Sequence, residues 1–162
     1  AALTGHLVFS TIHTNDAASG FTRLLNWDVE PFLIASTVKG ILAQRLVRRI
    51  CNECKESYSP NENELEMIGL DKDDPIEAYK GKGCLACRNT GFKGRIGIYE
   101  LLLMDGEISE LVLNQEPGYK IREQARANGM TTLLEDGLIK IKRGDTTISE
   151  VYETLGTSKI VL

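Results

Sequence analysis

The chain has 162 residues, of which 42% are hydrophobic and 26% charged, so its composition is that of a globular domain and excludes a disordered or fibrous protein. Its net charge of −4 argues against a general nucleic-acid binder, because neutralising phosphates requires an excess of Lys and Arg. No apolar run approaches the ~18 residues of a membrane span, and no secretory signal is recognisable. Because the chain begins with Ala1 rather than Met, we expect it to be part of a longer protein.

The first predicted elements are a strand and a helix in direct succession. Residues 6–12 form an apolar run without alternation, which is typical of a strand covered on both faces of a parallel sheet. Asp16 and its neighbours then supply helix-capping side chains, and apolar residues repeat at helical spacing over residues 17–27. A second helix is predicted over residues 31–37, opened by a proline. Residues 40–50 fit a helix or a strand on periodicity alone.

The amino-acid composition changes after residue 50. Residues 51–94 are rich in Cys, Gly, Asn, Lys and acidic residues, which indicates an inserted module rather than a core element. Residues 94–101 alternate in the manner of a strand, with Ile96, Ile98 and Glu100 on one face. Beyond this strand, capping residues, prolines and glycines predict four short helices, over residues 105–114, 117–129, 132–144 and 147–156.

The last two of these helices open on the capping-box pattern Thr-x-x-Glu, at Thr132 with Glu135 and at Thr147 with Glu150. In a capping box the Thr and Glu side chains satisfy each other's backbone N–H groups. We therefore expect the Glu150 carboxylate to accept a hydrogen bond from the backbone N–H of Thr147.

Charge is distributed unevenly within the inserted module. Residues 61–79 carry seven acids and one base, and residues 80–95 carry five bases and no acid. Two interpretations stay open: the two segments pair with each other, or the bases form a docking surface for a protein. One nearby aromatic residue, Phe92, is too little for a base-stacking platform, so we do not expect nucleic acid as the partner. The acids are Glu62, Glu64, Glu66, Asp71, Asp73, Asp74 and Glu77, and the bases are Lys80, Lys82, Arg88, Lys93 and Arg95.

The sharpest chemical signal is a pair of Cys-x-x-Cys motifs that contains every cysteine of the chain: Cys51, Cys54, Cys84 and Cys87. Two such turns can complete a tetrahedron of thiolates around one zinc ion, and four sulfur ligands leave no open coordination position. Two disulfides, free buried thiols or a redox pair are the alternatives, and a reducing compartment disfavours the disulfides. We therefore predict a structural zinc ion.

Two histidines, His6 and His13, flank the predicted opening strand. Their odd spacing directs them to opposite faces of a regular strand, so a shared metal ion is not expected. His13 falls where the strand ends and the helix begins, which is the edge where open α/β sheets bind ligands. From the pattern alone, His13 is either a ligand-sensing residue or a structural one. No phosphate-binding loop of the Gly-x-x-x-x-Gly-Lys-Ser/Thr type occurs anywhere in the chain.

Several motifs together resemble one family, the secretion ATPases of the GspE and PilB type, which serve bacterial type II secretion and type IV pilus assembly. Residues 2–17 resemble its histidine box, and residues 43–51 resemble the segment that leads into its tetracysteine module. Residues 94–101, 131–140 and 144–151 are similar to its C-terminal motifs, in the same order.

The resemblance implies an α/β fold: the C-terminal part of a RecA-like P-loop ATPase domain, with an inserted tetracysteine zinc module and a C-terminal helical bundle. It gives His13 the role of monitoring the γ-phosphate of ATP, with His6 as its companion. It also implies that residues 44–49 and 94–101 are the two strands of a hairpin.

The implied domain organisation has four parts. Residues 1–50 are the end of the ATPase core, residues 51–93 the zinc-binding insertion, residues 94–104 a returning strand and residues 105–162 the helical subdomain.

The resemblance further implies a homo-hexameric motor in the cytoplasm, peripheral to the inner membrane, that binds ATP and Mg²⁺ and passes force to a membrane platform protein. The absent phosphate loop predicts that this chain alone is inactive. Pilus assembly, type II secretion and DNA uptake all stay open. The competing hypothesis is a stand-alone zinc-ribbon module that binds nucleic acid or protein through its basic residues.

Overall fold

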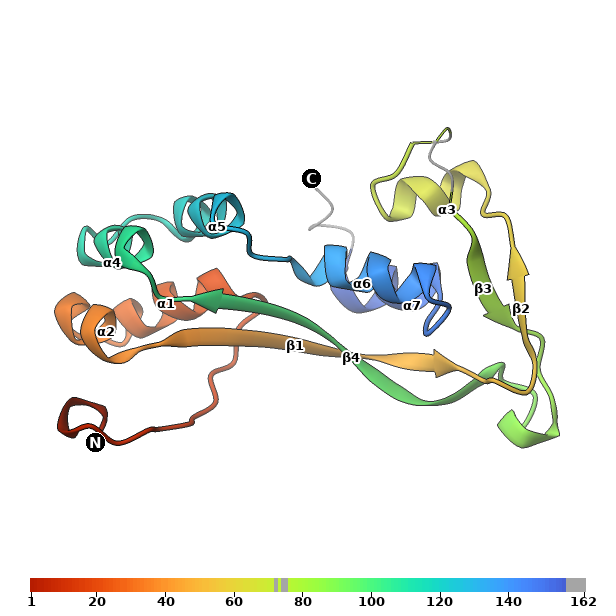
Figure 1. The fold of residues 1–162 in the computed structure, drawn as a ribbon, viewed down its shortest axis with the longest axis horizontal. Coiled ribbons are helices and arrows are strands. Elements are labelled where there is room, and N and C mark those ends of the chain that lie inside the picture. Colours follow the sequence, from red (N-terminus) through yellow and green to blue (C-terminus); the bar gives the residue numbers. More distant parts are fainter. Residues whose placement is uncertain (72, 74–75, 157–162) are drawn as a thin grey trace. The chain divides into compact units, whose positions relative to one another are not determined.

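The computed structural model describes residues 1–71, 73 and 76–156, and these fold into a mixture of helices and strands (Figure 1). The chain divides into two compact units. Unit 1 comprises residues 1–43 and 99–132, and unit 2 comprises residues 44–98 with the chain from residue 133 onward. No helix among the described residues is long and apolar enough to cross a membrane.

Unit 1 is built mainly from helices. Its elements are the 3₁₀ turn η1 (Ala2–Thr4) and the helices α1 (Ala17–Asn26), α2 (Pro31–Thr37), α4 (Gly106–Leu113) and α5 (Gly118–Ala127). Helix α1 packs against α5, α2 against α4, and α4 against α5. Their core is apolar and fully buried, with Phe21, Ile34, Ile108, Val112 and Ile121 at its centre. All four helices were predicted from the sequence: aspartates cap α1 and α4, and a proline stands at the start of α2 and of α5.

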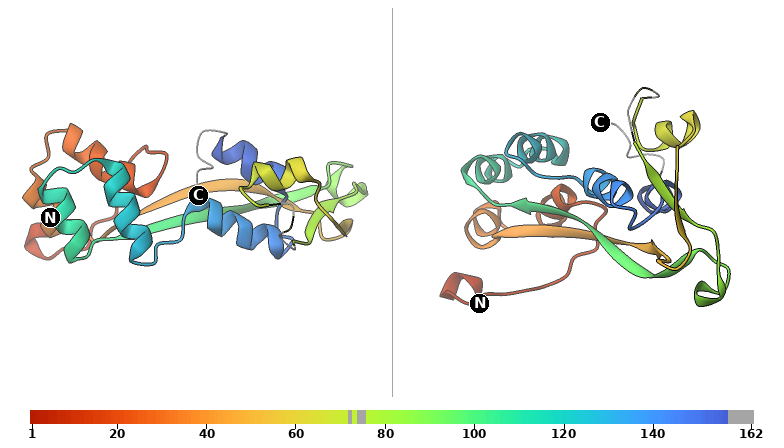
Figure 2. Two further views of the ribbon diagram at one scale, coloured as in Figure 1. Left: turned by 90° about the horizontal axis from the view of Figure 1, so that it is seen from above. Right: turned by 45° about the vertical axis from the view of Figure 1, so that its right-hand side comes forward.

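Two long strands, β1 (Gly40–Ile50) and β4 (Phe92–Leu103), form a two-stranded sheet and run in opposite directions (Figures 1 and 2). Periodicity alone left residues 40–50 as either a helix or a strand. The structure shows a strand there, as the resemblance implied when it predicted a hairpin. Side chains of β4 alternate as predicted, because Ile98 and Glu100 are buried whereas Tyr99 is exposed. At the start of β1, helix α1 approaches closely: a Cβ added at Gly20 would lie 2.7 Å from Cδ1 of Ile41.

The predicted opening strand is wrong for this structure, because residues 6–12 form no regular element. The side chains of Leu7 and Phe9 are 79% and 89% exposed. A strand requires neighbours that accept and donate its backbone hydrogen bonds, and the sheets of the described residues pair only β1 with β4 and β2 with β3.

Unit 2 includes the second part of β1 and the first part of β4. It contains β2 (Lys55–Tyr58), α3 (Glu62–Met67), β3 (Ala78–Gly81), the 3₁₀ turn η2 (Leu85–Cys87), α6 (Leu133–Lys142) and α7 (Ile148–Leu155). Strands β2 and β3 are antiparallel, with Lys55 opposite Gly81 and Tyr58 opposite Ala78. Helix α7 packs on α6 and α3, and a Cβ added at Gly137 would lie 2.8 Å from Cγ1 of Val151.

Helix α3 was not predicted. It lies in the acidic segment, and its first turn is closed by a capping box in which Asn61 and Glu64 satisfy each other. Tyr58 also donates a 2.7 Å hydrogen bond to Glu64. Six residues rich in acids carry too little apolar periodicity to signal a helix. Lys72 and Asp74 of the same segment lie outside the described residues.

Candidate functional sites

The two Cys-x-x-Cys motifs occupy two tight turns of unit 2. Cys51 and Cys54 follow the end of β1, and the N–H of Cys54 donates to the carbonyl of Cys51 at 3.3 Å. Cys84 caps the start of η2 and Cys87 is its last residue, and the N–H of Cys87 donates to the carbonyl of Cys84 at 3.2 Å. A hydrogen bond from the N–H of Cys51 to the carbonyl of Gly91, at 2.9 Å, ties the first turn to the chain that leaves the second.

A close approach of two glycines permits this arrangement. A Cβ added at Gly81 would lie 2.1 Å from the carbonyl oxygen of Gly91, and one added at Gly91 would lie 2.5 Å from that of Gly81. Gly91 also has a φ of 77°, in the left-handed region that favours glycine. The two segments that flank the Cys84–Cys87 turn can therefore approach this closely only because both positions lack side chains.

The four sulfur atoms lie within 4.8 Å of one another. The Sγ separations are 3.9 Å for Cys51 and Cys84, 3.9 Å for Cys54 and Cys87, and 3.7 Å for Cys84 and Cys87. A tetrahedral ion with metal–sulfur bonds of ~2.3 Å separates its sulfur ligands by about 3.8 Å, whereas a disulfide requires about 2.05 Å. All four cysteines are free, and their spacing fits a metal site.

Hydrogen bonds prepare one of these sulfurs to carry negative charge. Burial raises the pKa of the Cys87 thiol, but N–H groups of Cys84 and Gly91 that donate to its Sγ, and the neighbouring thiols, lower that pKa to about 6. Burial and the hydrogen bonds of the other three thiols raise the pKa of Cys54 to about 12. A metal ion favours the thiolate form of each ligand, which is the ordinary state of cysteine in such sites.

The basic residues of the module divide into two groups. Lys80 and Lys82 both pair with Glu56 of β2, at 3.7 Å and 2.7 Å. This acid precedes the acidic segment 61–79 that we considered as their partner. None of the ion pairs found among the described residues involves Arg88, Lys93 or Arg95, and all three residues are exposed.

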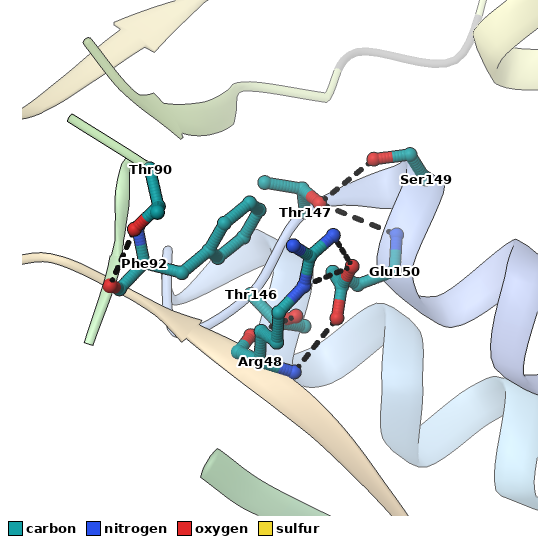
Figure 3. Close-up of polar contacts among 7 residues, drawn as sticks. All are labelled: Arg48, Thr90, Phe92, Thr146, Thr147, Ser149 and Glu150. Atoms are coloured by element: carbon teal, nitrogen blue, oxygen red, sulfur yellow. Dashed lines mark hydrogen bonds and ion pairs between the residues drawn. The ribbon is translucent and has the colours of Figure 1, made fainter. Parts of the chain in front are cut away.

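An ion pair that sequence reasoning missed connects α7 to the hairpin beside this module (Figure 3). The Glu150 carboxylate accepts hydrogen bonds from the backbone N–H of Arg48 and from its Nε, both at 2.8 Å, and also contacts its Nη2. The guanidinium lies 4.2 Å from the ring centre of Phe92. Thr147 caps α7 as predicted, at 3.3 Å from the N–H of Glu150, but the Glu150 carboxylate binds Arg48.

A second site lies in unit 1, where His13 lines a pocket of about 460 Å³ between α1 and α5. Every lining side chain is polar, and none is acidic. The pocket-lining residues are His13, Thr14, Asn15, Ser19, Thr22, Arg23, Asn26, Gly118, Tyr119 and Arg122. His6 is not among them, and its ring nitrogen Nδ1 lies 3.0 Å from the hydroxyl of Thr4.

Two buried carboxylates fix the beginning of α1, three residues after His13. Asp16 accepts a 2.8 Å bond from the N–H of Ser19 and a 2.7 Å bond from Nη2 of Arg122. Glu100 of β4 accepts a 2.8 Å bond from the N–H of Ala17. The capping role of Asp16 could be predicted from the sequence, but Arg122 and Glu100 lie more than 80 positions away and give no local signal.

Comparison with known proteins identifies relatives over almost all of this chain. Residues 1–153 match the family described as Type II/IV secretion system protein. The chain is 49% identical over 153 residues to the type IV pilus assembly ATPase PilB of Thermus thermophilus. The matched region covers 93% of this chain and 17% of that protein. It is 42% identical over 151 residues to the type II secretion system ATPase E of Vibrio cholerae, and this matched region covers 93% of this chain and 30% of that protein.

A third relative is the type IV pilus assembly ATPase TfpB of Acinetobacter baylyi, 43% identical over 157 residues, with 96% of this chain and 27% of that protein covered. The chain thus spans less than a third of the length of these relatives. These matches confirm the resemblance found in the motifs: the chain belongs to the type II/IV secretion system protein family.

Proposed function

We propose that this chain is the C-terminal part of a hexameric motor ATPase that couples ATP hydrolysis to type IV pilus assembly or type II protein secretion. The observation that carries the proposal is the match over residues 1–153 to proteins named as ATPases of both machines. The nucleotide-binding loop and the Mg²⁺ site then belong to the rest of the motor, since no such loop occurs here.

The proposed organisation keeps the four parts expected from the sequence. Residues 1–50 end a RecA-like ATPase core, residues 51–93 form the zinc module, residues 94–104 return to the core and residues 105–162 form a helical subdomain. The α1–α2–β1 order and the closing run of helices support this division. Of the last range, residues 157–162 lie outside the described part of the chain.

The zinc module has a structural role in this proposal. Cys51, Cys54, Cys84 and Cys87 would hold one zinc ion, which the sulfur separations near 3.8 Å support. Bound zinc supplies folding energy, and a site with four thiolates leaves no position for substrate. The chain's own part is to present the four thiolates from two turns.

His13 is the residue that we propose to sense the γ-phosphate, and its place in a pocket lined by two arginines and no acidic residue supports this role. His6 lies outside that pocket, so its proposed part is limited to the segment that leads to His13. The membrane platform protein is the proposed partner at the cytoplasmic face of the inner membrane. Arg88, Lys93 and Arg95 are the bases best suited to dock there, because Lys80 and Lys82 already pair with Glu56.

The experiment is an ATPase assay of the full-length motor beside the 162-residue chain, with the particle mass of each measured by light scattering. We expect steady ATP hydrolysis and a hexamer for the full-length protein, and no hydrolysis by the chain alone. Turnover by the purified chain, or a full-length protein without ATPase activity, would contradict the proposal. Salt-sensitive binding of DNA or RNA by the chain would instead favour the zinc-ribbon alternative.

A further inference from the structure

The end of strand β1 has a free edge that the chain between α6 and α7 covers. In the sheets of the described residues β1 pairs only with β4, so the backbone groups of its other edge need different partners. The N–H of Ile50 donates to the carbonyl of Asp145 at 3.0 Å. The N–H of Arg48 donates to the Glu150 carboxylate at 2.8 Å, and the carbonyl of Arg48 accepts a 2.8 Å bond from the hydroxyl of Thr146 (Figure 3). These contacts take the place of a third strand.

The same stretch of chain, residues 143–150, also holds the other side of the first Cys-x-x-Cys turn. This turn, residues 51–54, directly follows β1 and directly precedes Lys55. The Nζ of Lys55 donates to the carbonyl of Arg143 at 3.2 Å. Gly144 permits this approach, because a Cβ added there would collide with the Lys55 side chain. Residues 143–150 therefore bind the chain immediately before and immediately after the turn that carries two of the four thiols.

Arg48 extends the same support to the second Cys-x-x-Cys turn. Besides binding Glu150, its guanidinium lies 4.2 Å from the ring centre of Phe92, the first residue of β4. The N–H of Phe92 lies 3.3 Å from the hydroxyl of Thr90, which donates a 2.6 Å bond to the carbonyl of Cys87. One arginine therefore connects α7 to the chain that leaves the second turn, so both turns are tied to residues 143–150.

We propose that residues 143–150 position the two Cys-x-x-Cys turns for their metal ion, with Thr146 and Glu150 as the chief positioning residues. The inference rests on the zinc site of the proposed function, and it adds to that site a support that lies about a hundred positions further along the chain than β1. Neither residue is among the four that could hold the metal, so both act through the end of β1. A ligand turn that is already held in place loses less conformational freedom when the ion binds, and this raises the affinity.

The test measures the zinc affinity of the reduced 162-residue chain by competition with a chromophoric chelator. We expect Thr146→Val, which removes a hydroxyl at nearly constant volume, and Glu150→Gln each to weaken zinc binding about tenfold, as is common for residues that support metal ligands. Thr146→Val keeps the test decisive should Glu150→Gln fail to fold. Because coupling between two events is reciprocal, zinc should in turn slow hydrogen exchange at the N–H groups of Arg48 and Ile50 about tenfold in the wild-type chain.

Matched variants separate positioning from a general loss of stability. Val151→Ala loosens the packing of α7 on α6 beside Gly137 but leaves the bonds to β1 in place, so its zinc affinity should stay within about threefold of wild type. Glu66→Gln, which removes an exposed carboxylate of α3, should also leave the affinity unchanged. Lys55→Met should weaken zinc binding more than Lys142→Met, which removes the same charge from an exposed position of α6.

Failure of the inference and failure of the proposed zinc site give different results. Wild-type zinc affinity in both Thr146→Val and Glu150→Gln, or an equal loss of affinity in Val151→Ala, would overturn the inference while the zinc site stands. Hydrogen exchange at Arg48 and Ile50 that zinc leaves unchanged would do the same, because the coupling must act in both directions. A reduced wild-type chain that binds no zinc would refute the zinc site, and the inference with it.

Discussion

Glu150 is 6% exposed, yet its carboxylate carries a charge that Arg48 compensates with three hydrogen bonds. Burial raises the pKa of Glu150, but the hydrogen bonds and charge of Arg48 lower it further, so the net pKa lies below its ordinary value. A carboxyl with a lowered folded-state pKa stabilises the fold above its unfolded pKa of about 4.3. This stabilisation is lost as the pH falls through the folded-state pKa.

We therefore expect Glu150→Gln to lower the free energy of unfolding by about 1–3 kcal/mol at pH 7, because the buried Glu150 side chain loses its charge-assisted hydrogen bonds to Arg48. The difference from wild type should shrink as the pH falls through the lowered folded-state pKa of Glu150, because the wild-type carboxyl then becomes protonated itself. Urea denaturation followed by circular dichroism at several pH values measures the loss of stability and its dependence on pH. Glu66→Gln, at an exposed position of α3, is the control and should cost less than about 0.5 kcal/mol. A cost for Glu150→Gln that does not change with pH would contradict this account.

Residue-level prediction from the sequence succeeded where the signal is local and failed where it is not. Asp16 and Thr147 cap their helices as predicted, because an N-cap contacts a residue three positions away. The partners of Asp16 and Glu150 are Arg122 and Arg48, about a hundred positions distant, and no spacing in one sequence reveals them.

At the scale of elements, the tetracysteine turns depend on one another through the proposed zinc ion. Strands β2 and β3 have four residues each, so a bound zinc ion, whose thiolate binding is worth of order 10–16 kcal/mol, would supply much of the folding energy of this part. We expect about one zinc per chain by elemental analysis, and loss of protection in residues 51–93 on chelation, while α1 and α5 stay protected from hydrogen exchange.

The matched variants for this prediction lie in one loop. Cys84→Ser should lower zinc content, whereas Ala86→Ser, which adds the same hydroxyl at an exposed neighbour, should not. Chain purified in reducing buffer that carries no zinc, or Cys84→Ser with full zinc content, would exclude this site.

Residues 6–12 show that a strand needs a paired neighbour as well as a suitable sequence. Residues 6–12 have the composition of a buried strand but lack a paired neighbour in the described structure, whereas β1 and β4 have each other. We expect amide hydrogens of residues 6–12 to exchange within seconds in this chain, and those of α1 to be at least about a hundredfold slower. Native-state hydrogen exchange with mass spectrometry measures both, and slow exchange of residues 6–12 in a proven monomer would contradict the structure.

At the scale of the whole molecule, the two candidate sites fall in different units. The His13 pocket belongs to unit 1 and the four cysteines to unit 2. We therefore propose that unit 1 senses the nucleotide, whereas unit 2 contributes to assembly and to docking of a partner protein. Local sequence motifs supplied the candidate residues of both sites, the Cys-x-x-Cys turns and the histidine box, but Arg23 and Arg122, which line the pocket, come from two separate helices.

The central claim is that His13 acts on the γ-phosphate within a motor ATPase, and steady-state kinetics of full-length His13→Ala test it most directly. Contacts made chiefly as charge develops in the transition state lower kcat rather than raise KM. We predict a fall in kcat of about a hundredfold with KM changed less than about threefold, and normal turnover for Glu123→Gln, an exposed control on α5. An unchanged kcat in a correctly assembled His13→Ala hexamer would contradict the account.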